Sequence, residues 1–296
     1  MRRLLIVGSG DVALRAIPML GKGYRVFALV RDPDKRPGIR ELGAVPLLGD
    51  LDDRASLAHI GGLADAVLHL APPPNSGVLD TRTRNLLSAL SQGRGRGRSL
   101  PKRLVYISTS GVYGDCGGAW VSETRPVNAT SPRSRRRVDA EMQIRSWAKY
   151  NRVNACILRV PGIYAADRLP LGRLQQGTPG IIDNEDSYTN HIHADDLAHI
   201  CAAALYHGKS CRVYHTSDDS QLKMGEYFDQ VADAFGLPHV PRVSRSEAQR
   251  VLSPMLLSFM NESRRLTNRR MKAELNVKLA YPTVADLLAT IKRPQT

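Results

Sequence analysis

Short apolar runs alternate with amphipathic stretches from residue 3 to about residue 160, and this alternation constrains the fold more than any other feature of the chain. Nearly every position of a run is apolar, which is typical of strands in a parallel sheet that is covered on both faces. The runs are Leu4–Val7, Val26–Val30, Val45–Leu48, Ala66–Leu70, Leu104–Ile107 and Ala155–Val160. The stretches between them predict helices at 11–21, 53–60, 80–91 and 131–150. Strands and helices in alternation predict an α/β fold with a doubly wound parallel sheet and helices on both faces.

The second half of the chain does not continue the alternation of apolar runs and amphipathic stretches. Loops rich in Gly, Pro and Asp follow residue 160, with a short strand at Arg212–His215. Helices are predicted near 195–207, 222–236 and 283–291. We therefore expect a dinucleotide-binding domain over residues 1–160 and a smaller substrate-binding lobe over 161–296 that is partly interleaved with the sheet.

The composition limits the partners. Lys and Arg outnumber Asp and Glu by 42 to 28, a formal net charge of +14, which favours anionic partners such as dinucleotides or phosphorylated substrates, or else reflects a basic, solvated surface. The single Gly/Arg stretch at 93–98 resembles RNA-binding segments but is more typical of a solvated loop, so a nucleic-acid partner is not expected. No apolar run reaches the ~20 residues of a membrane helix, so no membrane partner is expected. The four cysteines lack metal-ligand spacing, which predicts reduced thiols, a cytoplasmic location and no metal site.

A glycine motif follows the first predicted strand. The segment Gly8-Ser9-Gly10-Asp11-Val12-Ala13 fits G-x-G-x-x-A, the dinucleotide-binding pattern. The first glycine permits a tight turn, the second lets the backbone approach a pyrophosphate, and the small third residue lets helix pack on strand. The helix N-terminus supplies N–H donors for the phosphates. The motif predicts that residues 8–12 bind a nicotinamide dinucleotide.

The ends of the next strands favour NADP over NAD. Val30 stands where an NAD site usually has an acid, and Arg31, which follows it, can pair with a 2′-phosphate. Asp32 lies just beyond the position where an NAD site has its acid, so NAD remains an alternative cofactor. Asp50 and Leu51, with Ala71 and Pro72, come after the third and fourth strands, on the edge where such sheets bind ligands. Asp50 either accepts from the adenine amino group or caps the helix predicted near Asp53.

With these motifs the chain resembles the extended short-chain dehydrogenase/reductases, the NAD-dependent epimerase/dehydratase family. The resemblance covers nearly the whole chain. The segments that carry it are Gly8–Gly10, Gly49–Leu51, His69–Ala71, Val105–Gly114, Leu158–Tyr164 and His191–Ala198. It implies a Rossmann core, a smaller C-terminal substrate lobe, often a homodimer, and nucleotide sugars or related hydroxy and keto compounds as substrates.

The catalytic pattern of that family is only partly present. Thr109 stands four residues before Tyr113, where the family has the Ser or Thr that hydrogen-bonds the reacting oxygen. The family's acid/base is a Tyr with a Lys four residues later, and anchoring the pattern on Glu141 puts Arg133 at the Tyr position and Arg137 at the Lys position. Arginine cannot exchange protons near pH 7. Arg137 either holds the cofactor ribose or pairs with Glu141 on the helix surface.

Other residues are therefore considered for the site. Tyr113 and Tyr164 are the predicted proton donors, each with a packed core aromatic as the alternative. Arg133 and His193 are predicted to contact substrate. Asp195 and Asp196 are better explained as helix caps than as metal ligands.

Two functions are compatible with this pattern. The first is an NAD(P)-dependent oxidoreductase, epimerase or dehydratase that acts on a hydroxyl or keto centre of a small, anionic, sugar-nucleotide-like substrate. The second is a non-catalytic NADP-binding regulator like the NmrA-type proteins, which keep the Rossmann site without the Tyr/Lys pair.

Overall fold

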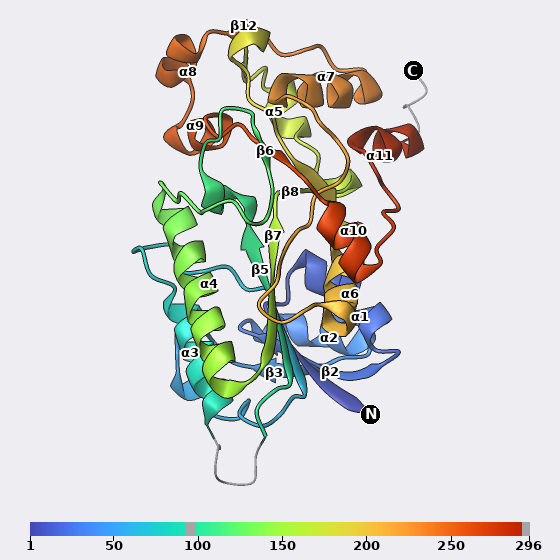
Figure 1. The fold of residues 1–296 in the computed structure, drawn as a ribbon. Helices are drawn as coiled ribbons and strands as arrows, with labels where there is room; N and C mark the ends of the chain where they lie inside the picture. Colours follow the sequence, from blue (N-terminus) through green and yellow to red (C-terminus); the bar gives the residue numbers. More distant parts are fainter. Residues whose placement is uncertain (93–98, 292–296) are drawn as a thin grey trace.

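A seven-stranded, fully parallel sheet forms the centre of the molecule (Figure 1). The computed structural model describes residues 1–92 and 99–291, so the Gly/Arg stretch at 93–98 lies outside the described residues. The strands are buried at most positions on both faces, as the apolar runs predict. They are β1 (Arg2–Val7), β2 (Tyr24–Val30), β3 (Val45–Leu48), β4 (Ala66–His69), β5 (Arg103–Thr109), β7 (Asn154–Val160) and β11 (Val213–His215).

The strand order is β11-β7-β5-β4-β1-β2-β3, which reverses direction between β1 and β4. In a doubly wound sheet, such a reversal opens a crevice beyond the carboxyl ends of the two strands, and ligands bind there. The last strand, β11, comes from the second half of the chain, which agrees with an interleaved lobe. The boundary at residue 160 stays a prediction.

Helices cover both faces of the sheet (Figure 1). One face packs against α1 (Asp11–Leu20) and α6 (Ala194–His207), with α10 (Arg269–Leu275) beside them. The other packs against α3 (Thr81–Ser91) and α4 (Pro132–Asn151). Of the helices predicted around the sheet, those at 11–21, 80–91, 131–150 and 195–207 correspond to α1, α3, α4 and α6, and the one at 53–60 has no counterpart.

The helix predicted at 53–60 is wrong. Only a short 3₁₀ turn, η2 (Ala55–Leu57), forms there, because short polar side chains bond to the local backbone in place of a helical ladder. Asp53 accepts from the Ala55 amide, and the Ser56 hydroxyl donates to the Asp53 carbonyl. The sequence pattern also misses α2 (Arg36–Glu41), whose Pro37 and Gly38 disfavour a helix.

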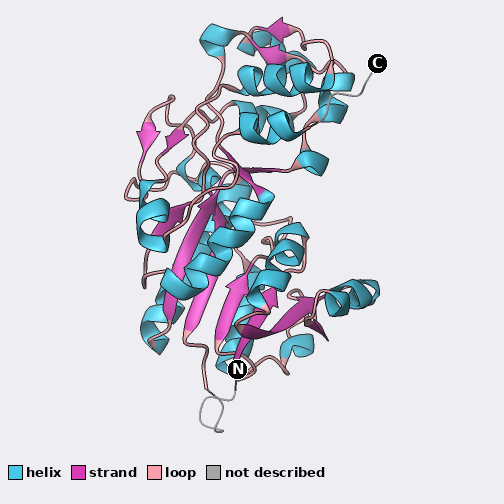
Figure 2. Cartoon of the chain, turned by 90° about the vertical axis from the view of Figure 1, so that its right-hand side faces the viewer, coloured by secondary structure: helices cyan, strands magenta, loops and turns pink. Residues whose placement is uncertain are grey.

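The C-terminal lobe lies beyond the carboxyl edge of the sheet (Figure 2). Its core forms between α7 (Met224–Phe235), α11 (Val284–Thr290) and α5 (Leu171–Gln175). Three two-stranded parallel pairs link distant segments: β8 (Gly162–Tyr164) with β10 (His191–His193), β6 (Trp120–Val121) with β13 (Arg265–Leu266), and β9 (Gly180–Ile181) with β12 (Arg242–Val243). The remaining helices are α8 (Arg245–Val251) and α9 (Pro254–Met260). No helix in residues 1–92 or 99–291 has the length and apolar character needed to cross a bilayer.

Candidate functional site

A pocket of about 590 Å³ opens at the carboxyl edge of the sheet, at the reversal between β1 and β4. Every residue that the sequence predicts to bind the cofactor lines it: Gly8, Ser9, Gly10, Asp11, Val12, Arg31, Asp50, Leu51, Ala71, Pro72 and Arg137. These residues come from the loops after four strands, from the start of α1 and from α4. The strand ends therefore bring the separate sequence motifs to one place.

The two glycines of the loop after β1 differ in their surroundings. Gly8 has φ +97°, and a Cβ there would lie 2.5 Å from the Ala71 amide nitrogen. Gly10 has φ −89°, and a Cβ there would meet nothing within 4 Å. Ser9 closes the loop by donating its hydroxyl to the Leu29 carbonyl at 2.8 Å. Gly8 is therefore required by the fold, whereas the space beside Gly10 is open to a ligand.

The N-terminus of α1 borders this open space, and the charges around it are paired: Arg15 with Asp11, Asp167 and Asp195, and Arg168 with Asp11. Asp11 opens the helix and accepts hydrogen bonds from Arg15 at 2.9 Å and from Arg168 at 3.0 Å. Arg168 also lines the pocket, and it belongs to the short 3₁₀ turn η4 (Ala166–Arg168) that follows β8. Helix N–H groups and arginines together suit an anion such as a pyrophosphate.

Basic side chains line the pocket beyond β2. Arg31 and Lys35 both line it. Asp32 lines the pocket as well, and its Oδ1 accepts from the Asp34 amide at 3.0 Å and caps a 3₁₀ turn. Asp50 accepts from the Asp52 amide at 2.9 Å. Asp50 thus stabilises a local turn while still lining the pocket.

The pocket is also lined by Arg137, on the α4 side. Its Nη1 donates to the Ile107 carbonyl at 2.7 Å and to the Tyr106 hydroxyl at 3.1 Å. The alternative of a surface pair with Glu141 is wrong, since Glu141 is buried and pairs with Arg159 at 2.7 Å. Burial, with the charge of Arg137, also lowers the pKa of His69 to about 3.

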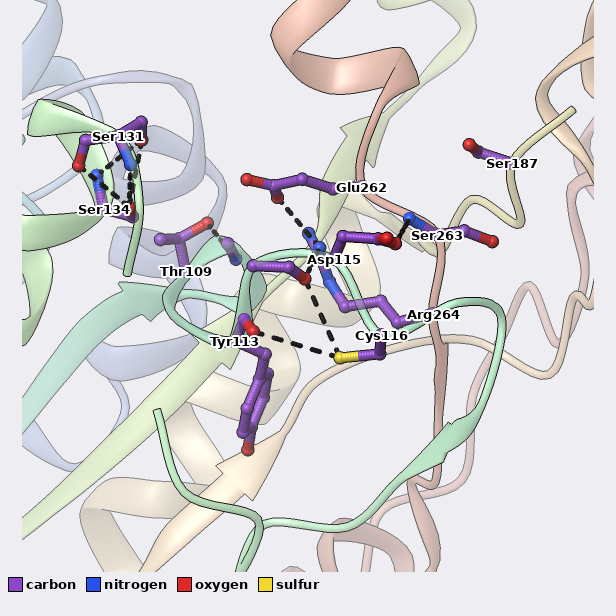
Figure 3. Close-up of polar contacts among 12 residues, drawn as sticks. Thr109, Tyr113, Asp115, Cys116, Ser131, Ser134, Ser187, Glu262, Ser263 and Arg264 are labelled. Atoms are coloured by element: carbon purple, nitrogen blue, oxygen red, sulfur yellow. Dashed lines mark hydrogen bonds and ion pairs between the residues drawn. The ribbon is translucent and has the colours of Figure 1, made fainter. Parts of the chain in front are cut away.

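Thr109 and Tyr113 lie at the end of β5 but point in different directions (Figure 3). The Thr109 Oγ1 accepts from the Gly111 amide at 3.2 Å. The Tyr113 ring points away from Thr109, and its hydroxyl is buried, 2.6 Å from both Arg159 Nη1 and His215 Nε2. Burial raises the pKa of Tyr113. These surroundings correspond to the packed alternative for Tyr113; its role as proton donor stays a prediction.

Tyr164 is also buried and does not line the pocket. Burial, followed by the nearby Asp218 carboxylate, raises its pKa far above the ordinary range of a phenol. Its role as proton donor likewise stays untested.

The structure gives the other sequence-predicted residues of this region separate roles. His193 is buried and caps α6 by accepting the Asp195 amide at Nδ1, 3.2 Å away. The prediction that Asp195 or Asp196 caps this helix is therefore wrong; Asp195 pairs with Arg15, and Asp196 accepts backbone N–H groups near residue 280. Within the described ranges, no three His, Cys, Asp or Glu side chains form a metal-binding group.

The first turn of α4 brings Arg133 near Arg137. A capping box of Ser131 and Ser134 starts the helix, and Figure 3 shows these serines beyond Thr109. Burial, then the charge of Arg137, lowers the pKa of Arg133. Arg133 does not line the pocket itself.

A segment of the C-terminal lobe that the sequence analysis missed also reaches the end of β5 (Figure 3). Glu262 Oε2 accepts from Arg264 at 2.8 Å, and Arg264 donates to the Gly114 carbonyl at 2.8 Å. The Ser263 amide donates to Asp115 at 2.8 Å. Arg264 and Ser263 lie about 150 residues from Gly114 and Asp115, so no local pattern could pair these two segments.

Known proteins resemble this chain in both sequence and fold. The profile of the NAD dependent epimerase/dehydratase family matches residues 15–216. A dTDP-glucose 4,6-dehydratase of Mycolicibacterium smegmatis is 32% identical over 180 residues, 53% of this chain and 52% of that protein. The chain spans about half the length of the curated dehydratases it matches.

Two solved structures match over almost the full chain. A functionally unknown conserved protein from Silicibacter pomeroyi is 31% identical with a TM-score of 0.79 over 98% of both chains. A UDP-glucuronic acid 4-epimerase from Bacillus cereus, solved with UDP-glucuronic acid and NAD, has a TM-score of 0.75 at 18% identity, over 98% of this chain and 97% of that one. At that identity the likeness is one of fold.

Proposed function

The chain belongs to the NAD dependent epimerase/dehydratase family, and from this premise we propose that it is an NADP-preferring enzyme acting on a hydroxyl or keto carbon of a small anionic substrate. The observation that carries the proposal is the open space beside Gly10. A Cβ built on Gly10 would meet no protein atom within 4 Å, so packing of the protein does not explain the glycine. The open space adjoins a helix N-terminus in a pocket that all the predicted cofactor residues line. A bound nicotinamide dinucleotide supplies reversible hydride transfer.

The residues of the pocket divide between the parts of such a dinucleotide. The α1 N-terminus and Arg168 would hold the pyrophosphate, and Arg137 would hold the nicotinamide ribose. Arg31 and Lys35 would hold the phosphorylated ribose of the adenosine. These two cations support the proposed preference for NADP, while Asp32, the acid that lines the pocket beside them, has one oxygen in the cap of a turn.

The substrate is proposed to lie over the end of β5. Thr109 orients the reacting oxygen there, and Arg133 supplies positive charge for an anionic group. The substrates named for the related dehydratase and epimerase are sugar nucleotides, which supports an anionic substrate of that kind. A homodimer is proposed on the family resemblance alone.

A non-catalytic NADP-binding regulator is the second candidate. It is favoured by α4, whose one lysine and one tyrosine, Lys149 and Tyr150, lie in the last turn. Tyr113, which could replace them, has its hydroxyl committed to Arg159 and His215.

Titration of both oxidised cofactors against wild type and Arg31→Ala tests the proposal. Losing a charge-assisted bond to phosphate costs about 1.5–3 kcal/mol, so NADP should bind roughly 10- to 150-fold more weakly while NAD is unaffected. Arg40→Ala, an exposed arginine of α2 outside the pocket lining, is the matched control. Equal weakening of both cofactors would refute the assignment of Arg31.

Turnover separates the two candidate functions. The assay follows NADPH oxidation and the conversion of dTDP-glucose and UDP-glucuronic acid. Tight NADP binding without conversion of any hydroxyl or keto compound would favour the regulator.

A further inference from the structure

A carboxylate and a hydroxyl from distant parts of the chain both lie near Gly111, just after β5 and outside the lining of the cofactor pocket. A methyl group built on Gly111 would lie 3.8 Å from Glu262 Oε2 and 3.6 Å from Thr109 Oγ1. The Glu262 side chain is 19% exposed, and Figure 3 shows its carboxylate directed toward Thr109 from the segment between α9 and β13. The charge of Glu262 also acts on Arg133, against the effects of burial and Arg137. The carboxylate is therefore within electrostatic reach of Arg133, in the first turn of α4.

We propose that Glu262 exchanges the proton of the substrate oxygen that Thr109 orients. The inference rests on the proposed function, and it supplies the acid/base that α4 lacks. A glutamate is ionised at neutral pH and can accept a proton, whereas Arg133 and Arg137 keep theirs.

The step balances as follows in the direction of oxidation. Glu262 takes the hydroxyl proton, and the electron pair of the O–H bond becomes the second bond of the new carbonyl. The electron pair of the C–H bond leaves with its hydrogen as hydride to the oxidised nicotinamide. In the reverse direction Glu262 returns the proton to the oxygen as hydride reaches the carbon.

Arg264 is the positioning residue for this carboxylate. It is 10% exposed and is itself fixed by the Gly114 carbonyl, so it holds Oε2 in a defined place. Among the described residues, none hydrogen-bonds to the other oxygen, Oε1. That oxygen is the one that faces substrate in this proposal.

A measurement without turnover tests whether Glu262 acts on the nicotinamide end of the pocket. The oxidised nicotinamide ring is cationic and the reduced ring is neutral, so a nearby carboxylate favours the oxidised form. Dissociation constants for NADP⁺ and NADPH are measured for wild type, Glu262→Gln and the control Glu247→Gln, an exposed glutamate of α8. The ratio of the two constants should shift about three- to tenfold toward NADPH in Glu262→Gln, and stay at the wild-type value in Glu247→Gln.

Turnover is measured on the same variants with dTDP-glucose and UDP-glucuronic acid. Glu262→Gln should lower kcat by about 10²–10⁴, with thermal unfolding checking that the variant is folded. Glu262→Asp, which keeps the charge, should keep the cofactor ratio even where kcat falls.

The outcomes distinguish a failure of the role proposed for Glu262 from a failure of the proposed function. An unchanged cofactor ratio in folded Glu262→Gln overturns the role of Glu262, as does full kcat in that variant. If neither sugar nucleotide is converted by wild type, the cofactor ratio decides alone. If wild type binds neither cofactor, the proposed function itself fails.

Discussion

At the scale of single residues, the two glycines of the loop after β1 have different roles: Gly8 is needed for folding, and Gly10 leaves space for a ligand. Gly8 combines a positive φ with a backbone approach to Ala71 that leaves no room for a side chain. Gly10 has an extended conformation that any residue adopts, and it lines the pocket at a place where a Cβ would meet no protein atom within 4 Å. Both glycines belong to the same sequence motif, and only the structure shows that glycine is needed for folding at position 8 but not at position 10.

We predict that Gly10→Val loses dinucleotide binding but stays folded, at a cost of about 1 kcal/mol for the altered helix cap. Gly8→Val should destabilise by more than about 2 kcal/mol, because it adds both strain and a backbone clash. Denaturant unfolding and cofactor titration of the two variants check this contrast. Wild-type affinity in folded Gly10→Val would mean that the loop is a turn and nothing more.

At the scale of elements, a buried ionic network holds α4 against the sheet. Glu141 of α4 pairs with Arg159 of β7 and accepts from Ser108 of β5 at 2.7 Å. Arg159 also donates to Tyr113 at 2.6 Å, and its guanidinium lies 4.8 Å from the centre of the Tyr113 ring. Arg137 and Arg133 are carried on the same helix, so this network sets where they stand relative to the pocket.

We predict that Arg159→Met destabilises the protein by about 3–5 kcal/mol, because it leaves the Glu141 carboxylate buried without its partner. Tyr113→Phe, which removes one hydroxyl from the network, should cost about 1–3 kcal/mol. Urea unfolding of both variants measures these losses. A stable Tyr113→Phe protein whose kcat falls 10²-fold or more would instead support Tyr113 as the proton donor.

The elements also show what the sequence could predict. Strands covered on both faces are apolar throughout, so their positions and the pocket at their carboxyl ends follow from local pattern. The helix at 53–60 fails because the side chains of Asp53 and Ser56 bond locally. Glu262 and Arg264 could not be found this way, because the contacts that place them at β5 join residues about 150 positions apart.

At the scale of the whole molecule, the junction between sheet and C-terminal lobe buries ionisable groups, Asp218 among them. Asp218, in the loop after β11, donates its amide to the His191 carbonyl of β10 at 2.7 Å. Its Oδ1 accepts from the Ser220 amide at 3.0 Å, while Oδ2 has no hydrogen bond within the described chain. Burial, and after it the charge of Asp218, raises the pKa of Tyr164 in β8 and of Tyr227 in α7. Burial raises the pKa of Asp218 to about 7.

A buried carboxyl group with a raised pKa lowers stability as the pH rises, whereas buried histidines with lowered pKa values lower stability as the pH falls. Burial lowers the pKa of His69 and His215 to about 3 and that of His191 to about 4. In the unfolded chain each takes up a proton near pH 6.5, so the unfolded state binds more protons and stability falls as the pH drops from about 6.5 to 4. Wild-type stability alone therefore mixes the two effects.

The difference between wild type and Asp218→Asn isolates the carboxylate. Folded Asp218 keeps its proton up to about pH 7, whereas the unfolded chain releases it near pH 4, so wild type loses stability as the pH rises between these values. Asn cannot ionise, so Asp218→Asn should gain up to about 2–4 kcal/mol over wild type at pH 8, and the gain should vanish at pH 4. Urea unfolding at pH 4, 6 and 8 measures the difference, with Asp34→Asn, an exposed carboxylate of the 3₁₀ turn at Pro33–Lys35, as the control. A difference that does not change with pH would show that the folded protein does not hold the Asp218 proton at this junction.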